Sequence, residues 1–161
     1  MHKYLLLIAT IVFSLDGFTK WLVKTTIPLD GGIEVIPGLF HITHLENRGV
    51  AFSMFADSPG PWLSRFLVLL SLAAVVLVGI LLWKRGTVMN RTTVALALFL
   101  GGTLGNLYDR LTRGQVTDFL DVFVGSHHWP AFNVADSAIV AGALLLISQI
   151  FLAPQEEKMA G

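Results

Sequence analysis

The sequence predicts an all-α membrane protein with four transmembrane helices and a small extracytoplasmic β-sheet between the first two helices. Hydrophobic residues make up 54% of the 161 residues and charged residues only 14%, whereas an average soluble protein has about 25% charged residues. The mean hydropathy is +0.70, and one small soluble core has too little interior to bury that much apolar surface. We therefore expect a single integral membrane domain over residues 1–161.

Four apolar stretches are the predicted helices, each close to the length that crosses a hydrocarbon core of about 30 Å. They cover residues 4–23, 66–83, 92–110 and 135–153. The first stretch is similar to a secretory signal with Lys3 as its basic end, but Asp16 and Lys20 stand where a small-residue cleavage site would follow, so we expect a retained helix. In the third stretch, the Gly101-x-x-x-Gly105 spacing indicates close helix packing.

Basic residues set the expected orientation of the helices. Lys84, Arg85 and Arg91 flank the short turn between the second and third predicted helices, with no acid nearby. Because Lys and Arg are enriched on the cytoplasmic side, this turn and both chain ends are expected in the cytoplasm. The longer connections, residues 25–63 and 111–132, then lie on the outer side of the membrane.

The first outer segment has the signals of short strands. Residues 33–36 and 39–46 are predicted strands around a Pro37-Gly38 turn, and residues 49–54 are a candidate third strand. The Ser-Pro-Gly-Pro run within residues 57–62 is expected to break the chain before the second helix. We expect the resulting sheet to rest on the outer surface of the membrane.

Composition excludes several classes of function. The net charge is +0 and the pI is about 7.0, so there is no electrostatic case for nucleic-acid binding. The absence of cysteine excludes disulfides, thiolate zinc sites and thiol catalysis. The outer segments carry possible metal ligands, but a His-x-x-His spacing on a strand points its two rings to opposite faces, so no metal and no cofactor is expected. These ligands are His41, His44, His127 and His128.

Polar residues gather at one predicted depth, the outer ends of the first, third and fourth helices. Asp16 and Lys20 have the i, i+4 spacing of a helical ion pair, and Asn133 and Asp136 lie three residues apart at the start of the fourth helix. Ionisable groups in membrane helices are costly, which makes them functional candidates. One face of the third helix carries Gly102, Asn106, Asp109 and Arg113, with Arg110 beside it.

Two carboxylates held close together can share one proton, which is the chemistry of an aspartic protease. Asp118 and Asp136 come from separate elements and can converge, whereas cations near Asp16 and Asp109 favour ionised, structural roles for those acids. We expect Asp121 to be more exposed. An ordinary salt-bridge network at the helix ends is an alternative that spacing alone leaves open.

A set of motifs in fixed order resembles the lipoprotein signal peptidases (signal peptidase II) over nearly the whole chain. Two positions differ from the family pattern: Gly17 stands where glutamine is usual, and Val50 stands where a small residue is common. The motifs are Asp16-Gly-Phe-Thr-Lys20, Asn47-Arg-Gly-Val-Ala-Phe-Ser53, Gly101-Gly-Thr-Leu-Gly-Asn-Leu-Tyr-Asp-Arg110, Gly114-Gln-Val-Thr-Asp-Phe119 and Phe132-Asn-Val-Ala-Asp-Ser137.

The resemblance implies an aspartic endopeptidase of the bacterial cytoplasmic membrane, without metal, that cleaves prolipoproteins before a diacylglyceryl-modified cysteine. It implies a catalytic dyad of Asp118 and Asp136, with Asp16 and Lys20 as a structural pair. Membrane lipid and the cyclic peptide inhibitor globomycin are the other implied partners, and we expect a monomer. The implied supporting or substrate-binding residues are Asn47, Gly49, Asn106, Asp109, Arg110, Asn133 and Ala135.

Two other readings of the polar residues compete with this one. A serine–lysine protease would use Lys20 as base with Ser14 or Ser53 as nucleophile, but Ser14 lies on a different helix face and Ser53 lacks a nucleophile-elbow motif. A small transporter or ion-pathway protein would also place acids inside the membrane. The acids here fall at one end of the predicted helices rather than along them, which disfavours a pathway.

Overall fold

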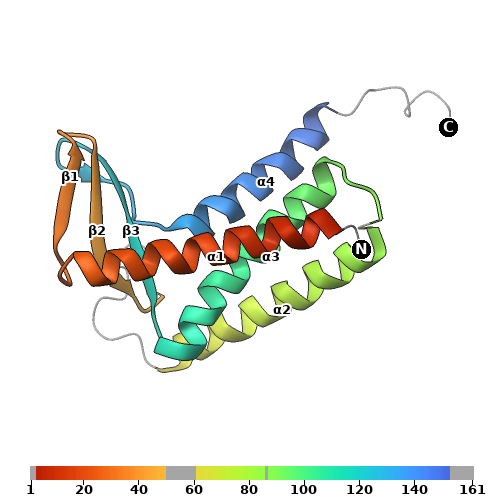
Figure 1. The fold of residues 1–161 in the computed structure, drawn as a ribbon, viewed down its shortest axis with the longest axis horizontal. Helices are drawn as coiled ribbons and strands as arrows, with labels where there is room; N and C mark the ends of the chain where they lie inside the picture. The colour runs from red at the N-terminus through yellow and green to blue at the C-terminus, as the bar shows by residue number, and fades with distance from the viewer. Residues whose placement is uncertain (1–2, 50–60, 86, 153–161) are drawn as a thin grey trace.

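The protein is seen in a computed structural model that describes residues 3–49, 61–85 and 87–152 (Figure 1). Four long helices lie beside one another, and a small antiparallel sheet stands at one end of them. The helices are α1 (Lys3–Thr26), α2 (Pro61–Arg85), α3 (Arg91–Arg113) and α4 (Val134–Leu152). The strands are β1 (Gly32–Ile36), β2 (Phe40–Asn47), β3 (Val116–Val124) and β4 (His127–His128). The predicted fold class, four helices with a small sheet, is confirmed.

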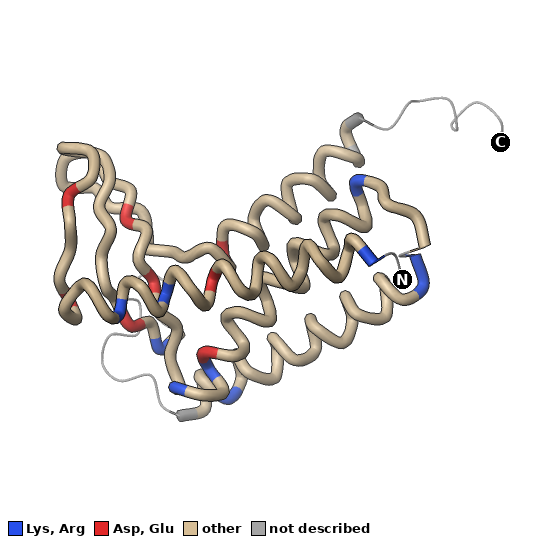
Figure 2. The backbone as a smooth tube through the Cα atoms, in the orientation of Figure 1, with Lys and Arg blue, Asp and Glu red and all other residues tan. Residues whose placement is uncertain are grey.

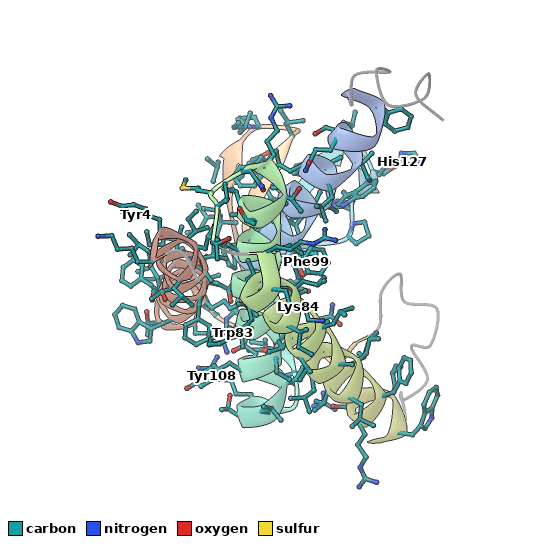
Figure 3. All side chains as sticks on the ribbon, turned by 90° about the vertical axis from the view of Figure 1, so that its right-hand side faces the viewer. Tyr4, Trp83, Lys84, Phe99, Tyr108 and His127 are labelled. Atoms are coloured by element: carbon teal, nitrogen blue, oxygen red, sulfur yellow. The ribbon has the colours of Figure 1, made fainter. Side chains whose placement is uncertain are left out.

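Helix α3 is the centre of the bundle. Viewed along the helices, it lies between α1, α2 and α4 (Figure 3), and it packs against all three. Its glycines permit this approach: a Cβ on Gly101 would lie 2.6 Å from the carbonyl oxygen of Ala9 on α1, and one on Gly102 would overlap the carbonyl oxygen of Ala135 on α4. Small residues at such contacts allow helix backbones to come close in a membrane. The close packing predicted for Gly101 and Gly105 is confirmed.

The bundle surface is strongly apolar, as a membrane protein requires. Helices α1 and α2 are long and apolar enough to cross a bilayer, and α4 contains a shorter apolar stretch, Val134–Gln149. Large side chains such as Leu69, Leu144 and Phe151 are 65%, 61% and 80% exposed. Contiguous exposure of this kind in a water-soluble protein would promote aggregation, whereas lipid accommodates it.

The first two strands form the predicted hairpin. The N–H of Leu39 donates to the carbonyl oxygen of Ile36 at 3.1 Å, and Gly38 has a φ of +73°. Proline followed by a residue with positive φ is the pattern of a type II turn. Strand β2 then pairs with β3, with Leu45 opposite Asp118, and a bulge lies between Ile42 and Leu45.

In the part of the chain that the structure describes, the third strand of the sheet comes from the second outer segment. The candidate over residues 49–54 falls outside the described residues after Gly49, as does most of the expected break over 57–62, whose Pro61 begins α2. This strand is β3, and the strand order is β1-β2-β3-β4. The first half of β3 is buried on both faces, so it lacks the polar alternation that marks a half-exposed strand.

Charge is distributed unevenly along the bundle. Asp and Glu residues of the described chain lie toward the sheet end, while basic residues are also found at the opposite end (Figure 2). Helix α1 begins and α4 ends away from the sheet (Figure 1). The turn between α2 and α3, with Lys84, Arg85 and Arg91, is at that same end.

Candidate active site

Asp118 and Asp136 are joined through one asparagine at the sheet end of the bundle. The Nδ2 of Asn133 donates to Asp118 Oδ1 at 2.8 Å, and its Oδ1 accepts the backbone N–H of Asp136 at 2.9 Å. In return, Asp136 Oδ2 accepts the backbone N–H of Asn133 at 3.3 Å. This reciprocal pattern is a capping box, which local sequence favours because Asn133 immediately precedes α4. One cap therefore fixes the two carboxylates relative to each other.

Two further asparagines complete the contacts of the carboxylates. Asn47 Nδ2 donates to Asp118 Oδ2 at 2.9 Å, while its Oδ1 accepts the N–H of Gly49 at 2.7 Å. Asn106 Nδ2, from α3, donates to Asp136 Oδ1 at 2.7 Å. Residues from β2, β3, α3 and the start of α4 thus converge on one place, and three predicted supporting residues (Asn47, Asn106 and Asn133) lie there together.

The two carboxyl groups have different surroundings. Asp118 is only 4% exposed, and burial raises its pKa from 3.8 to about 6, with the nearby Asp136 adding to the rise and the hydrogen bonds from Asn47 and Asn133 opposing it. Asp136 is half-buried in the first turn of α4, where the helix dipole favours a negative charge. A proton shared by the pair would thus reside on Asp118.

A buried ion cluster of Asp16, Lys20 and Asp109 lies next to Asn106, the α3 residue that contacts Asp136. Lys20 Nζ is 2.7 Å from Asp16 Oδ2 and 2.8 Å from Asp109 Oδ2, and all three residues are at most 3% exposed. The predicted pair of Asp16 and Lys20 is therefore present, but Asp109 belongs to the same cluster. Asp109 also pairs with Arg113 at 3.1 Å, as the sequence suggested. The other oxygen of Asp16 accepts the N–H of Ala135 at 2.9 Å.

This cluster is connected to the carboxyl pair by hydrogen bonds that the sequence motifs did not predict. Lys20 Nζ donates to Asn106 Oδ1 at 3.0 Å, and Asn106 in turn contacts Asp136. Asn133 Nδ2 also approaches Asn106 Oδ1, at 3.2 Å. A signal was available, because Asn106 and Asp109 share one face of α3 and both therefore face the same segment of α1.

Gly49 contacts Asn47, the residue that binds Asp118, and Arg110 is close enough to both carboxyl groups for their charges to interact. Gly49 has a φ of +99°, and a Cβ there would overlap the side chain of Leu67. Arg110 is half-buried on α3, and its charge interacts with those of Asp136 and Asp118. The region around the two carboxylates thus contains a half-buried cation.

Asp121, which was expected to be more exposed than Asp118, is buried almost as deeply as Asp118, which is 4% exposed. Asp121 is 7% exposed, because His128 Nδ1 lies 2.9 Å away on β4 and His41 Nδ1 lies 3.6 Å away on β2. His44 is also buried, and its Nδ1 lies 2.8 Å from the carbonyl oxygen of Ile27. Among the residues that the structure describes, no three His, Cys, Asp or Glu side chains form a group that could hold a metal ion.

The alternative of a serine–lysine protease is disfavoured by the surroundings of Lys20. A catalytic lysine must contact its serine hydroxyl to accept the proton, but Lys20 Nζ contacts Asp16 Oδ2 at 2.7 Å, Asp109 Oδ2 at 2.8 Å and the amide oxygen of Asn106 at 3.0 Å. Ser14 is exposed on α1, and Ser53 lies outside the described residues. The ion-pathway alternative is disfavoured because the clustered acids occupy one end of the bundle (Figure 2).

The chain is similar to known proteins over most of its length. The family model described as signal peptidase (SPase) II matches residues 8–152. The lipoprotein signal peptidase of Solibacter usitatus is 47% identical over 140 residues, which cover 87% of this chain and 85% of that protein. The corresponding protein of Alteromonas mediterranea is 45% identical over 146 residues, covering 89% and 78%.

Solved structures have the same fold. A bacterial membrane enzyme structure determined in meso at 2.3 Å resolution has a TM-score of 0.83 and 28% identity, covering 100% of this chain and 95% of that one. A second, at 1.9 Å resolution, has a TM-score of 0.82 and 28% identity, covering 96% of both chains. With the family match spanning nearly all of the described chain, the protein belongs to the signal peptidase II family.

Proposed function

We propose that this protein is an intramembrane aspartic endopeptidase that removes the signal peptide from bacterial prolipoproteins, cleaving before the diacylglyceryl-modified cysteine. The observation that carries the proposal is the pair Asp118 and Asp136, bridged by the side chain of Asn133. The relatives named lipoprotein signal peptidases supply the substrate class. Residues 1–161 act as one peptidase domain.

In the proposed reaction, ionised Asp136 takes a proton from a water molecule as the water oxygen attacks the scissile carbonyl carbon. Protonated Asp118 donates its proton to the carbonyl oxygen, giving a neutral tetrahedral intermediate. The carbon–nitrogen bond then breaks, the leaving nitrogen takes the proton held by Asp136, and the intermediate returns a hydroxyl proton to Asp118. The raised pKa of Asp118, about 6, supports its role as the initial acid.

The remaining residues near the dyad bind the substrate or orient the catalytic carboxyl groups. The half-buried cation of Arg110 is placed to attract a carbonyl of the substrate near the scissile bond. Asn47 holds Asp118 through its amide nitrogen, which supports an orienting role. Gly49 permits the turn in which the backbone N–H of Gly49 donates to Asn47 Oδ1. Strands β1 and β2 support the peptide chain, and the diacylglyceryl group stays in the lipid.

The proposed location is the bacterial cytoplasmic membrane, with both chain ends in the cytoplasm and the dyad at the outer face. Lys84, Arg85 and Arg91 at the end away from the sheet support this orientation. A monomer is sufficient, because one chain supplies every residue assigned above. Globomycin, the inhibitor that the family resemblance implies, is expected to occupy the dyad region and to compete with substrate.

The experiment is cleavage of a defined precursor by the full chain purified in detergent. A prolipoprotein carrying the diacylglyceryl group should yield a mature chain beginning with the modified cysteine, identified by mass spectrometry. The same precursor without the lipid is the matched control and should be cut poorly. No cleavage of the lipidated precursor by folded enzyme would refute the proposal, and ion flux in vesicles would then favour the transport alternative.

A further inference from the structure

Lys20 is completely buried, yet it makes one contact that a purely structural ion pair does not need. Its ammonium group has three N–H donors and no acceptor. Lys20 Nζ forms ion pairs with Asp16 Oδ2 at 2.7 Å and Asp109 Oδ2 at 2.8 Å, and it donates a hydrogen bond to Asn106 Oδ1 at 3.0 Å. The acceptor of this hydrogen bond belongs to the amide that binds Asp136.

The contact with Lys20 decides which way the Asn106 amide faces. An asparagine side chain presents an acceptor on one side and a donor on the other. With its oxygen toward Lys20, Asn106 presents its NH₂ group to Asp136 Oδ1 at 2.7 Å. A flip would place two donor groups against each other at Lys20 and two acceptor oxygens against each other at Asp136. Asn133 Nδ2, 3.2 Å from the same Asn106 oxygen, adds to the preference.

The packing of α1 on α3 makes this contact possible. A Cβ on Gly105 would lie 2.5 Å from Asp16 Oδ2, so the absence of a side chain there makes room for the carboxylate that holds Lys20. The other oxygen of Asp16 accepts the N–H of Ala135, next to Asp136 in the chain. The cluster therefore reaches Asp136 both through Asn106 and through the backbone of α4.

We propose that Lys20 is a positioning residue for Asp136 in the reaction, acting through the amide of Asn106. By fixing that amide, Lys20 keeps a donor on Asp136 Oδ1 and so holds in place the carboxylate that accepts a proton from water in the proposed reaction. The other charged groups facing Asp136 are Asp118 on β3 and Arg110 on α3. This inference rests on the proposed peptidase function and adds a role for a residue that the sequence had assigned only to a structural pair.

The test compares two variants that differ only at Lys20. Asp109→Asn removes one carboxylate and keeps Lys20, while Lys20→Met with Asp109→Asn removes the ammonium as well and leaves the net charge of the cluster as in the wild type. Relative to Asp109→Asn, the double variant should lose about 100-fold in kcat, the size of a misplacement of about 1 Å. KM should change little, because Lys20 is buried away from substrate, and the acid limb of kcat/KM against pH should move to higher pH. Arg113→Gln, on the far side of Asp109, should change neither parameter.

A second variant keeps the proposal testable if the double variant does not fold. Asn106→Ala leaves the ion cluster intact and should reproduce the kcat loss and the shift of the acid limb. Lys20→Met should then add little in that background. A folded double variant with the kcat and pH profile of Asp109→Asn, or a folded Asn106→Ala with wild-type kcat, would overturn the proposal. Wild type and Asp136→Asn run alongside: no cleavage by wild type refutes the peptidase function itself, not merely the role of Lys20.

Discussion

Asn133 Nδ2 lies 2.8 Å from Asp118 Oδ1. The same side chain caps α4 through the N–H of Asp136, so the amide that starts a helix also spaces the two carboxylates. The side chain of Asn133 therefore contributes both to the stability of α4 and to the placement of the carboxyl pair.

Asn133→Ala should therefore lose both stability and activity. Loss of a helix cap costs about 1 kcal/mol, and the carboxyl group of Asp118 would lose a donor in a buried site. The matched control is Asn90→Ala, which removes the capping box of α3 at the other end of the bundle. Thermal midpoints should fall in both variants, whereas kcat should fall only in Asn133→Ala. Equal activity in the two variants would contradict the spacing role of Asn133.

Stability should depend on pH through Asp118. Its pKa is raised from 3.8 to about 6, so between these values the folded state binds more protons than the unfolded state. Unfolding free energy then decreases as pH rises through this window, and the full penalty is present above about pH 6. Asp118→Asn removes the penalty. The thermal midpoint of the variant minus that of wild type should therefore be larger at pH 8 than at pH 4. A pH-independent difference between the two proteins would show that burial of this carboxyl has no such effect.

Gly105→Ala should disrupt the bundle. The added Cβ would lie 2.5 Å from Asp16 Oδ2 and would separate α1 from α3 at the buried ion cluster. Gly79→Ala is the control, because a Cβ on this α2 glycine meets nothing within 4 Å. The yield of folded protein in detergent and its thermal midpoint should fall for Gly105→Ala and stay near wild type for Gly79→Ala. Similar behaviour of the two variants would mean that the contact with Asp16 is unimportant.

Arg110→Ala should reduce activity and leave the fold intact. The side chain is half-buried, and its charge interacts with those of Asp136, Asp118 and Asp109; in the proposed reaction it holds a substrate carbonyl. We expect kcat/KM for the lipidated precursor to fall at least about tenfold, with a thermal midpoint near that of wild type. Turnover at the wild-type rate would remove the role assigned to Arg110.

Features that depend on local sequence could be predicted before the structure was known. The hairpin of β1 and β2 follows from Pro37-Gly38, and the pair of Asp16 and Lys20 follows from i, i+4 spacing. The helices were located from apolar length alone, although α2 begins at Pro61 rather than at 66. Proline is well accommodated in the first turn of a helix, where its missing N–H would have no partner within the helix.

Features that depend on contacts between distant segments could not be predicted from the sequence. Strand β3 pairs with β2 from across the chain and is buried at its start, so its sequence shows no simple alternation. Asp121 is buried because His41 and His128 come from the two neighbouring strands. The bond from Lys20 to Asn106 spans 86 residues, and only the packing of α1 on α3 brings the two together. The convergence of Asp118 and Asp136 was favoured by elimination among the acids, but the shared cap at Asn133 required the structure.

The most direct test of the dyad is cleavage of the diacylglyceryl-modified precursor by Asp118→Asn and Asp136→Asn beside wild type. Each amide keeps the shape of the carboxyl group but cannot act as the acid or base of the reaction. We predict that wild type cuts before the modified cysteine and that both folded variants have no measurable turnover. Turnover by either folded variant would contradict the assignment of that aspartate and make Asp109 or Asp16 the next candidate.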